Sequence, residues 1–462
     1  MSVVVVLLAL ALLMLVAYRG YSVILFAPVC AMLAVLLTEP RAVPAAFTGV
    51  FMEKMVVFIK LYFPVFLLGA IFGKLIEVSG YSKSIVASVV RRIGSQRAML
   101  SIVLVSALLT YGGVSLFVVV FAVYPFAADL FRQGNIPKRL IPGTLALGAF
   151  TFTMDALPGS PQIQNIIPTT FFKTTPWAAP WLGTIGAALI ATLGLAYLEA
   201  RRRAAAKRGE GYGEGHLNEP EPASPERLPH PCLALLPLVV VAAANKAFVH
   251  LIPRAYGTTF DVRLALEHPI TTHVPGIQAI WAVEAALLLG ILTVIVGAFG
   301  RVRAKAAEGT KAAIGGALLA SMNTASEYGF GAVIAALPGF LVLQRALGAI
   351  PNPLVNEAIT VTMLAGVTGS ASGGMSIALA AAADRFLSAA QAAHIPPDVL
   401  HRVAAMASGG MDTLPHNGAV ITLLAVTGLT HKTSYVDIFA VTAIKTIAVF
   451  FVIAVYYLTG LV

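Results

Sequence analysis

The chain has 462 residues, of which 58% are hydrophobic and only 11% are charged, and its formal net charge is +10. Soluble domains carry about 25% charged residues, so this composition excludes an ordinary soluble domain and indicates a polytopic membrane protein. The positive charge therefore reflects membrane topology and not affinity for nucleic acid. Because Cys30 and Cys232 both lie in apolar runs, we expect no disulfide framework and no cysteine-ligated metal, and the sequence indicates no cofactor.

Long apolar runs follow one another along the chain, and one hydrophilic stretch interrupts them. The first run has no basic segment before it and no cleavage pattern after it, so we expect a membrane helix and not a removed signal peptide. Residues 201–230 are rich in charge, Gly and Pro and are predicted to form a flexible linker between halves 1–200 and 231–462. The apolar runs are 2–18, 22–38, 55–79, 98–131, 140–175, 178–200, 232–252, 277–299, 311–336, 354–386, 399–429 and 435–461.

Clusters of basic residues predict the orientation of the chain, because Lys and Arg favour the cytoplasmic side of a membrane. This criterion places the linker inside and, after counting the crossings, both termini outside. The clusters are Arg91, Arg92 and Arg97; Arg132, Lys138 and Arg139; Arg201, Arg202, Arg203, Lys207 and Arg208; and Arg301, Arg303 and Lys305.

The run 98–131 is too long for one crossing, and both of its ends are basic. Its centre, YGGVS, places Gly112, Gly113 and Ser115 where the chain can turn. A re-entrant hairpin entering from the cytoplasm and two full crossings joined by a tight turn both fit the charges. We favour the re-entrant form because its arms are short for full spans.

The run 354–386 has the same design, with Gly373, Gly374 and Ser376 at its centre. The two hairpins therefore share a Gly-Gly-x-Ser pattern at their predicted tips. Counting crossings from the linker makes the second hairpin enter from the outside.

A broken helix follows each hairpin, at 140–175 and at 399–429, and each contains the pattern Met-Asp-x-Leu-Pro. Irregular backbone at membrane depth is tolerated only where it is buried in protein or lines a wet cavity. The order of three helices, hairpin, broken helix and closing helix recurs with opposite orientation. The predicted fold class is an all-α polytopic membrane protein with two inverted-topology repeats, each with a re-entrant hairpin and a broken transmembrane helix, as in transporters.

The prolines of the first break, Pro158 and Pro161, should end the helix near Asp155 and let it restart near Gln162. A break exposes carbonyls, which suit a cation, and N–H groups, which suit an anion. Uncharged side chains at the breaks and tips suit hydroxyls and carboxylates, although Ser115 and Ser376 could serve only helix packing, and His416 could serve only as a cap. The predicted substrate-binding side chains are those of Ser115, Ser160, Gln162, Gln164, Asn165, Ser376, His416, Asn417 and Thr422.

Three acidic residues at membrane depth are candidates for coupling transport to an ion. Asp155 and Asp412 precede the prolines, where an apolar environment disfavours the charged form, so each could carry a proton. Each could instead bind a cation with free carbonyls, or merely cap the following half-helix. Glu327, with Asn323 one turn before it, belongs either to an internal polar cluster or to the coupling site.

The chain resembles the gluconate permease family of bacterial proton-coupled symporters, within the ion transporter superfamily. The resemblance extends along the whole chain, and it is carried by segments 111–131, 141–169 and 408–438, of which IPGTLALGAFTFTMDALPGSPQIQNIIPT is the most specific. It implies uptake of gluconate, 3-hydroxybutyrate or a related acid by a homodimer in the bacterial inner membrane, with a scaffold domain and a moving, elevator-like transport domain.

By the same resemblance, the two tips and the two breaks form the substrate site. Sodium-coupled dicarboxylate members of the superfamily have Ser-Asn-Thr tips, whereas the first tip here is YGGVS, which favours proton coupling over sodium coupling. The residues carried over are Gly113, Ser115, Ser160, Asn165, Gly374, Ser376 and Asn417.

Two other classes of function fit less well. An intramembrane aspartyl protease would use two buried aspartates, but it needs a Gly-x-Gly-Asp element, and here Met411 precedes Asp412. A channel would not need duplicated broken helices around one central site. We therefore expect a transporter of a small carboxylate, coupled to protons or sodium and surrounded by lipid, and not an enzyme or a nucleic-acid-binding protein.

Overall fold

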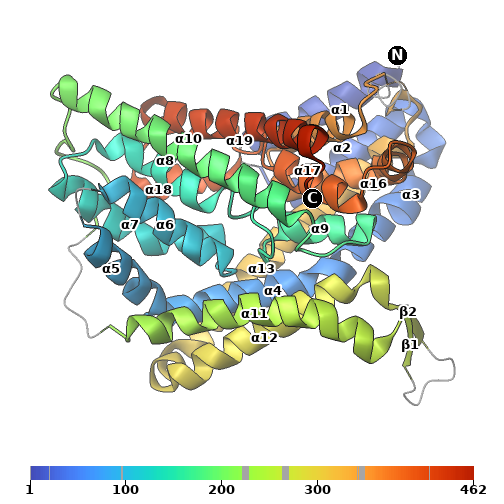
Figure 1. The fold of residues 1–462 in the computed structure, drawn as a ribbon. Helices are drawn as coiled ribbons and strands as arrows, with labels where there is room; N and C mark the ends of the chain where they lie inside the picture. Colours follow the sequence, from blue (N-terminus) through green and yellow to red (C-terminus); the bar gives the residue numbers. More distant parts are fainter. Residues whose placement is uncertain are drawn as a thin grey trace.

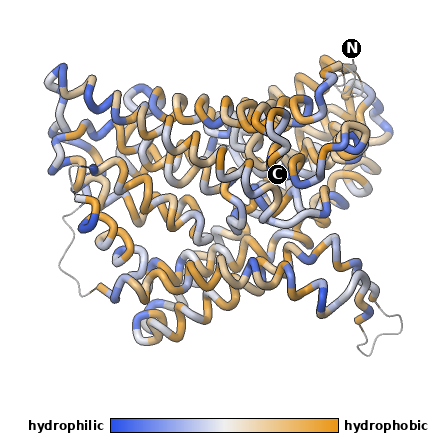
Figure 2. The backbone as a smooth tube through the Cα atoms, viewed as in Figure 1, coloured by the Kyte–Doolittle hydropathy of each residue, from blue (hydrophilic) through white to orange (hydrophobic). Residues whose placement is uncertain are grey.

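The computed structural model describes residues 2–19, 21–94, 97–220, 228–262, 270–340, 342, 349–415 and 417–462. The long helices run across the view in Figure 1, with α11 and α12 along the lower edge and α10 and α19 along the upper. Figure 2 shows hydrophilic residues gathered at the two ends of the molecule and apolar residues between them. The described helices that are long and apolar enough to cross a membrane are Pro40–Val78, Pro180–Lys207, Pro231–Tyr256, Gln278–Gly297 and His431–Thr459.

The first half contains three long apolar segments, a helical hairpin, a broken helix and a closing helix, in the predicted order. Its helices are α1 (Ser2–Tyr18), α2 (Val23–Thr38), η1 (Pro40–Ala42), α3 (Val43–Ala46), η2 (Phe47–Met52), α4 (Glu53–Val78), α5 (Tyr81–Ile93), α6 (Ala98–Tyr111), α7 (Leu116–Gln133), η4 (Lys138–Leu140), α8 (Ile141–Ala149), α9 (Ile163–Phe172) and α10 (Pro180–Lys207).

The second half repeats this order and adds a small antiparallel β-hairpin, which the expectation of an all-α chain did not include. The strands pair from Thr259 with His273 to Val262 with Ile270. The elements are α11 (Pro231–Tyr256), β1 (Thr259–Val262), β2 (Ile270–His273), η5 (Val274–Gly276), α12 (Gln278–Gly297), α13 (Phe299–Ala336), α15 (Pro353–Thr368), α16 (Ala371–Ala392), α17 (Pro397–Ser408), α18 (Gly418–Thr427) and α19 (His431–Thr459).

The contacts between helices have the reciprocal pattern of an internal repeat. Helices α4 and α13, which occupy equivalent places in the two halves, pack along each other. Helix α2 packs on α13 and its equivalent α12 packs on α4. The second arm of each hairpin packs on the other half's restarted helix, α7 on α18 and α16 on α9. The predicted fold class of two repeats, each with a hairpin and a broken helix, is confirmed.

The first hairpin turns where the sequence predicts it. Helix α6 ends at Tyr111, Gly113 adopts a left-handed φ of +94°, and Ser115 precedes α7. The second hairpin turns earlier than predicted, at Gly369, with φ +65°, and at Ser370, which caps α16 by accepting from Gly373 N at 3.1 Å. The proposed match between the two Gly-Gly-x-Ser segments is therefore wrong, and the equivalent pair is Ser115 and Ser370.

Gly373, Gly374 and Ser376 lie inside α16, where the two glycines allow close packing. A Cβ atom on Gly374 would collide with the backbone of Ala365 in α15, and one on Gly373 would collide with the Glu327 carboxylate. The Ser376 side chain is fully buried. The two glycines therefore let the arms of the second hairpin pack closely, and none of the three residues forms its tip.

We expect Gly374→Ala to lower the free energy of unfolding by about 1–3 kcal/mol, because the two arms must separate to admit the methyl group. Thermal unfolding of the purified protein in detergent would measure the change. Gly316→Ala in α13 is the matched control, since no atom lies within 4 Å of the added Cβ there. Equal stability of the two variants would contradict the close packing of α15 and α16.

Both breaks begin before their prolines, so the prediction that the first helix ends near Asp155 is wrong. Helix α8 ends at Ala149, and the hydroxyl groups of two following threonines donate to its last carbonyls. Thr151 donates to Leu147 O at 2.6 Å and Thr153 to Gly148 O at 2.8 Å. The restart at Gln162 is as predicted. The aspartates lie inside the breaks and cap neither helix.

The predicted flexible linker is ordered over most of its described part. Residues 201–207 continue α10, and the following segment is tied to the base of the first hairpin. Arg139 donates to Glu210 at 2.5 and 2.9 Å, which holds the pKa of that carboxyl below its ordinary value. Lys138 donates to Leu217 O at 2.8 Å. The charges that suggested a solvated linker are therefore used in fixed contacts.

Candidate substrate and coupling site

Each break is fastened to the hairpin tip of its own half by a side-chain amide. In the first half, Gln162 Nε2 donates to Thr110 O at 2.7 Å. In the second half, Asn417 Nδ2 donates to Gly369 O at 2.7 Å, while its Oδ1 accepts from the first backbone N–H groups of α18. Gln162 and Asn417 are the N-cap residues of α9 and α18. The two predicted site residues therefore hold tip and break together as equivalent amides.

The first break is filled by side chains from α17. The Arg402 side chain is fully buried and donates to Asp155 O at 3.1 Å, to Ala178 O at 2.8 Å and to Asn165 Oδ1 at 3.0 Å. His401, also fully buried, hydrogen-bonds Asn165 Oδ1 at 3.2 Å. Asn165 Nδ2 donates to Ser160 O at 2.9 Å and to Pro176 O at 2.8 Å. The polar atoms of Asn165 are thus used within the protein.

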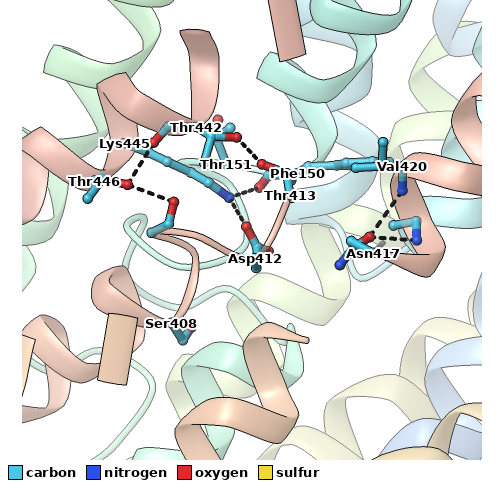
Figure 3. A network of polar contacts seen from close by, with 12 residues as sticks. Phe150, Thr151, Ser408, Asp412, Thr413, Asn417, Val420, Thr442, Lys445 and Thr446 are labelled. Atoms are coloured by element: carbon cyan, nitrogen blue, oxygen red, sulfur yellow. Dashed lines mark hydrogen bonds and ion pairs between the residues drawn. The ribbon is translucent and has the colours of Figure 1, made fainter. Parts of the chain in front are cut away.

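A buried ion pair joins the second break to α19 and to the end of α8. Lys445 Nζ lies 2.5 Å from Asp412 Oδ1 and donates to Phe150 O at 3.0 Å. Figure 3 shows the lysine reaching from α19 toward the aspartate. Gly409 provides the room: a Cβ atom there would collide with Asp155 Oδ2 and would lie 3.3 Å from Lys445 Nζ. Asp412 thus contacts the Lys445 ammonium, and Asp155 lies near it.

Several predicted polar side chains keep unused hydrogen-bonding capacity. Ser160 Oγ, Gln164 Oε1 and Ser376 Oγ are buried and have no hydrogen-bond partner among the described residues. Ser115 is half-buried at the start of α7, after the buried Gly113. Buried polar groups normally have a partner, so these atoms are available to a ligand or to water.

The last two predicted substrate-binding residues are Thr422 and His416. Thr422 donates its hydroxyl to Gly418 O at 2.8 Å within α18. The structure therefore does not bring Thr422 together with the other predicted substrate-binding residues. His416 lies outside the described residues.

Glu327 lies on α13, and its carboxyl faces the start of α16 beside the second tip. It is 4% exposed, the Ser370 hydroxyl donates to it, and its Oε2 has no partner among the described residues. The N-terminus of α16 and the Ser370 hydroxyl both face this carboxyl, and its second oxygen is left for a proton or a ligand.

Four buried polar residues were not predicted from the sequence. Lys445 and Arg402 each had a signal, since they are single basic residues within the apolar runs 435–461 and 399–429. Glu357 is fully buried on α15, and neither of its carboxylate oxygens has a hydrogen-bond partner within the described part of the chain. No sequence feature predicted a role for His401, apart from its position next to Arg402.

A helical inverted repeat, with two hairpins, two broken helices and a buried charge network between them, defines this chain as a membrane transporter and not an enzyme. The chain is 59% identical over 472 residues to the "Uncharacterized transporter YxjC" of Bacillus subtilis (strain 168), with both chains covered completely. It belongs to the transporter family of YxjC. No protein-family model matches the chain.

Two solved transporters are similar in fold. The YdaH transporter of Alcanivorax borkumensis superposes with a TM-score of 0.53 at 15% identity, over 92% of this chain and 90% of that one. MtrF of Neisseria gonorrhoeae superposes with a TM-score of 0.54 at 13% identity, over 88% of this chain and 82% of that one. At these identities the likeness concerns the fold alone.

Proposed function

We propose that the protein is a proton-coupled symporter that takes up a small organic anion, such as gluconate or a related sugar acid or hydroxy acid. The observation that carries this proposal is Glu327, a buried carboxyl beside a hairpin tip, one oxygen of which has no hydrogen-bond partner in the described part of the structure. A carboxyl in this place can take a proton when the site is occupied and release it when the site empties.

The substrate would be held without a basic side chain. Lys445 and Arg402 already use their donors on Asp412 and on protein oxygens, including Phe150 O and Ala178 O. A carboxylate would instead meet backbone N–H groups at the helix N-termini. The free groups of Ser160, Gln164 and Ser376 would bind its hydroxyls. This set of uncharged donors and acceptors suits a polyhydroxylated monoanion better than a dianion.

The membrane arrangement is part of the same proposal. We place the protein in the bacterial inner membrane as an elevator-type homodimer with both termini outside and residues 201–230 in the cytoplasm. The basic residues Arg132, Lys138 and Arg139, which bind residues 210–219, support a common cytoplasmic side for the linker and the base of the first hairpin.

The alternatives differ in substrate, ion or direction. A short hydroxy acid such as 3-hydroxybutyrate fits the same donors, and sodium could replace the proton. MtrF is described as illuminating a class of antimetabolite efflux pumps, so export is the other direction to test.

We expect purified protein in proteoliposomes to accumulate labelled gluconate when the outside is made acidic. An inward gradient of about one pH unit supports roughly tenfold accumulation per coupled proton. Parallel assays with labelled 3-hydroxybutyrate and with an inward sodium gradient at equal pH test the alternatives. Protein-free liposomes and proton-gradient collapse by an ionophore are the controls. If neither gradient drives uptake of either acid, the proposed symport is wrong.

A further inference from the structure

We propose that Lys445 is a tethered cation: its ammonium occupies a cation-binding position between α8 and the second break, and a chain that lacks this ammonium binds sodium there. Only its meaning for ion coupling rests on the proposed function. The assignment of the position itself can be tested by ion binding, without transport.

The surroundings of the Lys445 ammonium are the ligands of a hard cation. Phe150 O, at 3.0 Å from Nζ, belongs to the residue that ends α8, where carbonyls have no helical partner. Asp412 Oδ1 lies at 2.5 Å, and Asp155 Oδ2 lies near the same nitrogen, on the same side of Gly409. A carbonyl and a carboxylate in contact, with a second carboxylate nearby, are oxygen groups of the kind that small metal cations prefer.

The position also has the right electrostatics. The C-terminal end of α8 carries partial negative charge, and two buried carboxylates add to it. In transporters with broken helices, unwound carbonyls and half-helix C-termini are where sodium ions or protons bind. In this chain a side chain of α19 delivers the positive charge to that place.

The end of α17, the equivalent helix end in the second half, has no such cation among the described residues. Its carbonyls accept from neutral hydroxyls: Thr446 Oγ1 donates to Gly410 O at 2.6 Å and Thr362 Oγ1 to Ala407 O at 3.1 Å. The two repeats therefore differ in charge at their breaks. Arg402 differs from Lys445 as well, since its planar guanidinium spreads over several oxygens, whereas an ammonium is a compact charge comparable to a metal ion.

Lys445→Met tests this inference, because methionine keeps most of the side-chain length and apolar volume but has no Nζ. We expect its Tm in detergent to rise by about 3 °C or more when choline chloride is replaced by sodium chloride at equal ionic strength. The wild type should respond equally to both salts. The double variant Lys445→Met with Asp412→Asn, which also removes the carboxylate charge, should fold and lose the sodium response.

The outcomes separate clearly. A sodium-specific rise in Lys445→Met, or its recovery from membranes only in sodium buffer, supports the tethered cation. Equal Tm in both salts overturns it, and so does failure to recover the variant in either salt while the double variant is recovered in both. Failure of the transport assay with a sodium-specific Tm shift would overturn the proposed symport and leave this assignment standing.

Discussion

Replacing Arg402 by methionine is expected to lower the free energy of unfolding by about 3–5 kcal/mol, one of the two largest effects that the structure predicts. The guanidinium is fully buried and holds three backbone carbonyls, those of Asp155, Pro176 and Ala178. Methionine fills much of the space but donates nothing, so these oxygens lose their partner in an environment without water. Thermal and denaturant unfolding in detergent would measure the loss.

Arg303→Met is the control, because Arg303 is an exposed arginine on α13. Arg402→Lys adds a sharper comparison, since one ammonium cannot reach the oxygens that the planar fork bridges. We expect it to remain destabilised, although the charge is kept. Wild-type stability for Arg402→Met would mean that the first break is held by other contacts, chiefly the amide of Asn165.

The breaks and hairpins could be predicted because their signals are local. Proline and glycine disturb a helix wherever they occur, so Pro158 predicted a break and Gly113 predicted a turn from the sequence alone. The predicted end of the helix before the first break and the predicted turn of the second hairpin differ from those in the structure. Helix α8 ends before the predicted break, and Thr151 donates to a carbonyl of its last turn. The second hairpin turns at Gly369 and not at the predicted Gly373.

The charge network could not be predicted, because it depends on which helices meet. Lys445 and Asp412 lie on α19 and in the second break, and both meet the end of α8 from the other half of the chain. Hydropathy marks each residue as unusual, but it does not state which partner neutralises it. For that reason the sequence left open whether Asp155 and Asp412 carry a proton, bind a cation or cap a helix.

The structure divides the buried carboxyls into two groups. Asp412 pairs with Lys445, and Asp155 lies near that ammonium and near Arg402, which donates to its backbone carbonyl, so both have basic groups around them. Glu327 and Glu357 each have at least one oxygen without a partner among the described residues. A coupling proton is most useful on a carboxyl whose charge is otherwise uncompensated, because protonation then changes the local net charge most.

Glu327→Gln is therefore expected to abolish proton-driven accumulation, with a loss of roughly tenfold under a gradient of one pH unit. Glutamine keeps the size and the hydrogen bond with Ser370 but cannot release a proton. Exchange of labelled for unlabelled substrate, which needs no net proton movement, should persist. Measuring both in the same proteoliposomes distinguishes lost coupling from lost binding.

Glu357→Gln is the matched control, because Glu357 is equally buried but lies about 18 Å along α15 from the turn at Gly369. We expect it to keep accumulation within about twofold of the wild type, a change of under 0.5 kcal/mol in driving force. Full accumulation by Glu327→Gln would remove Glu327 from the coupling step. Loss in Glu357→Gln alone would move that step from α13 to α15, so the pair of variants separates the effect of position from the effect of burial.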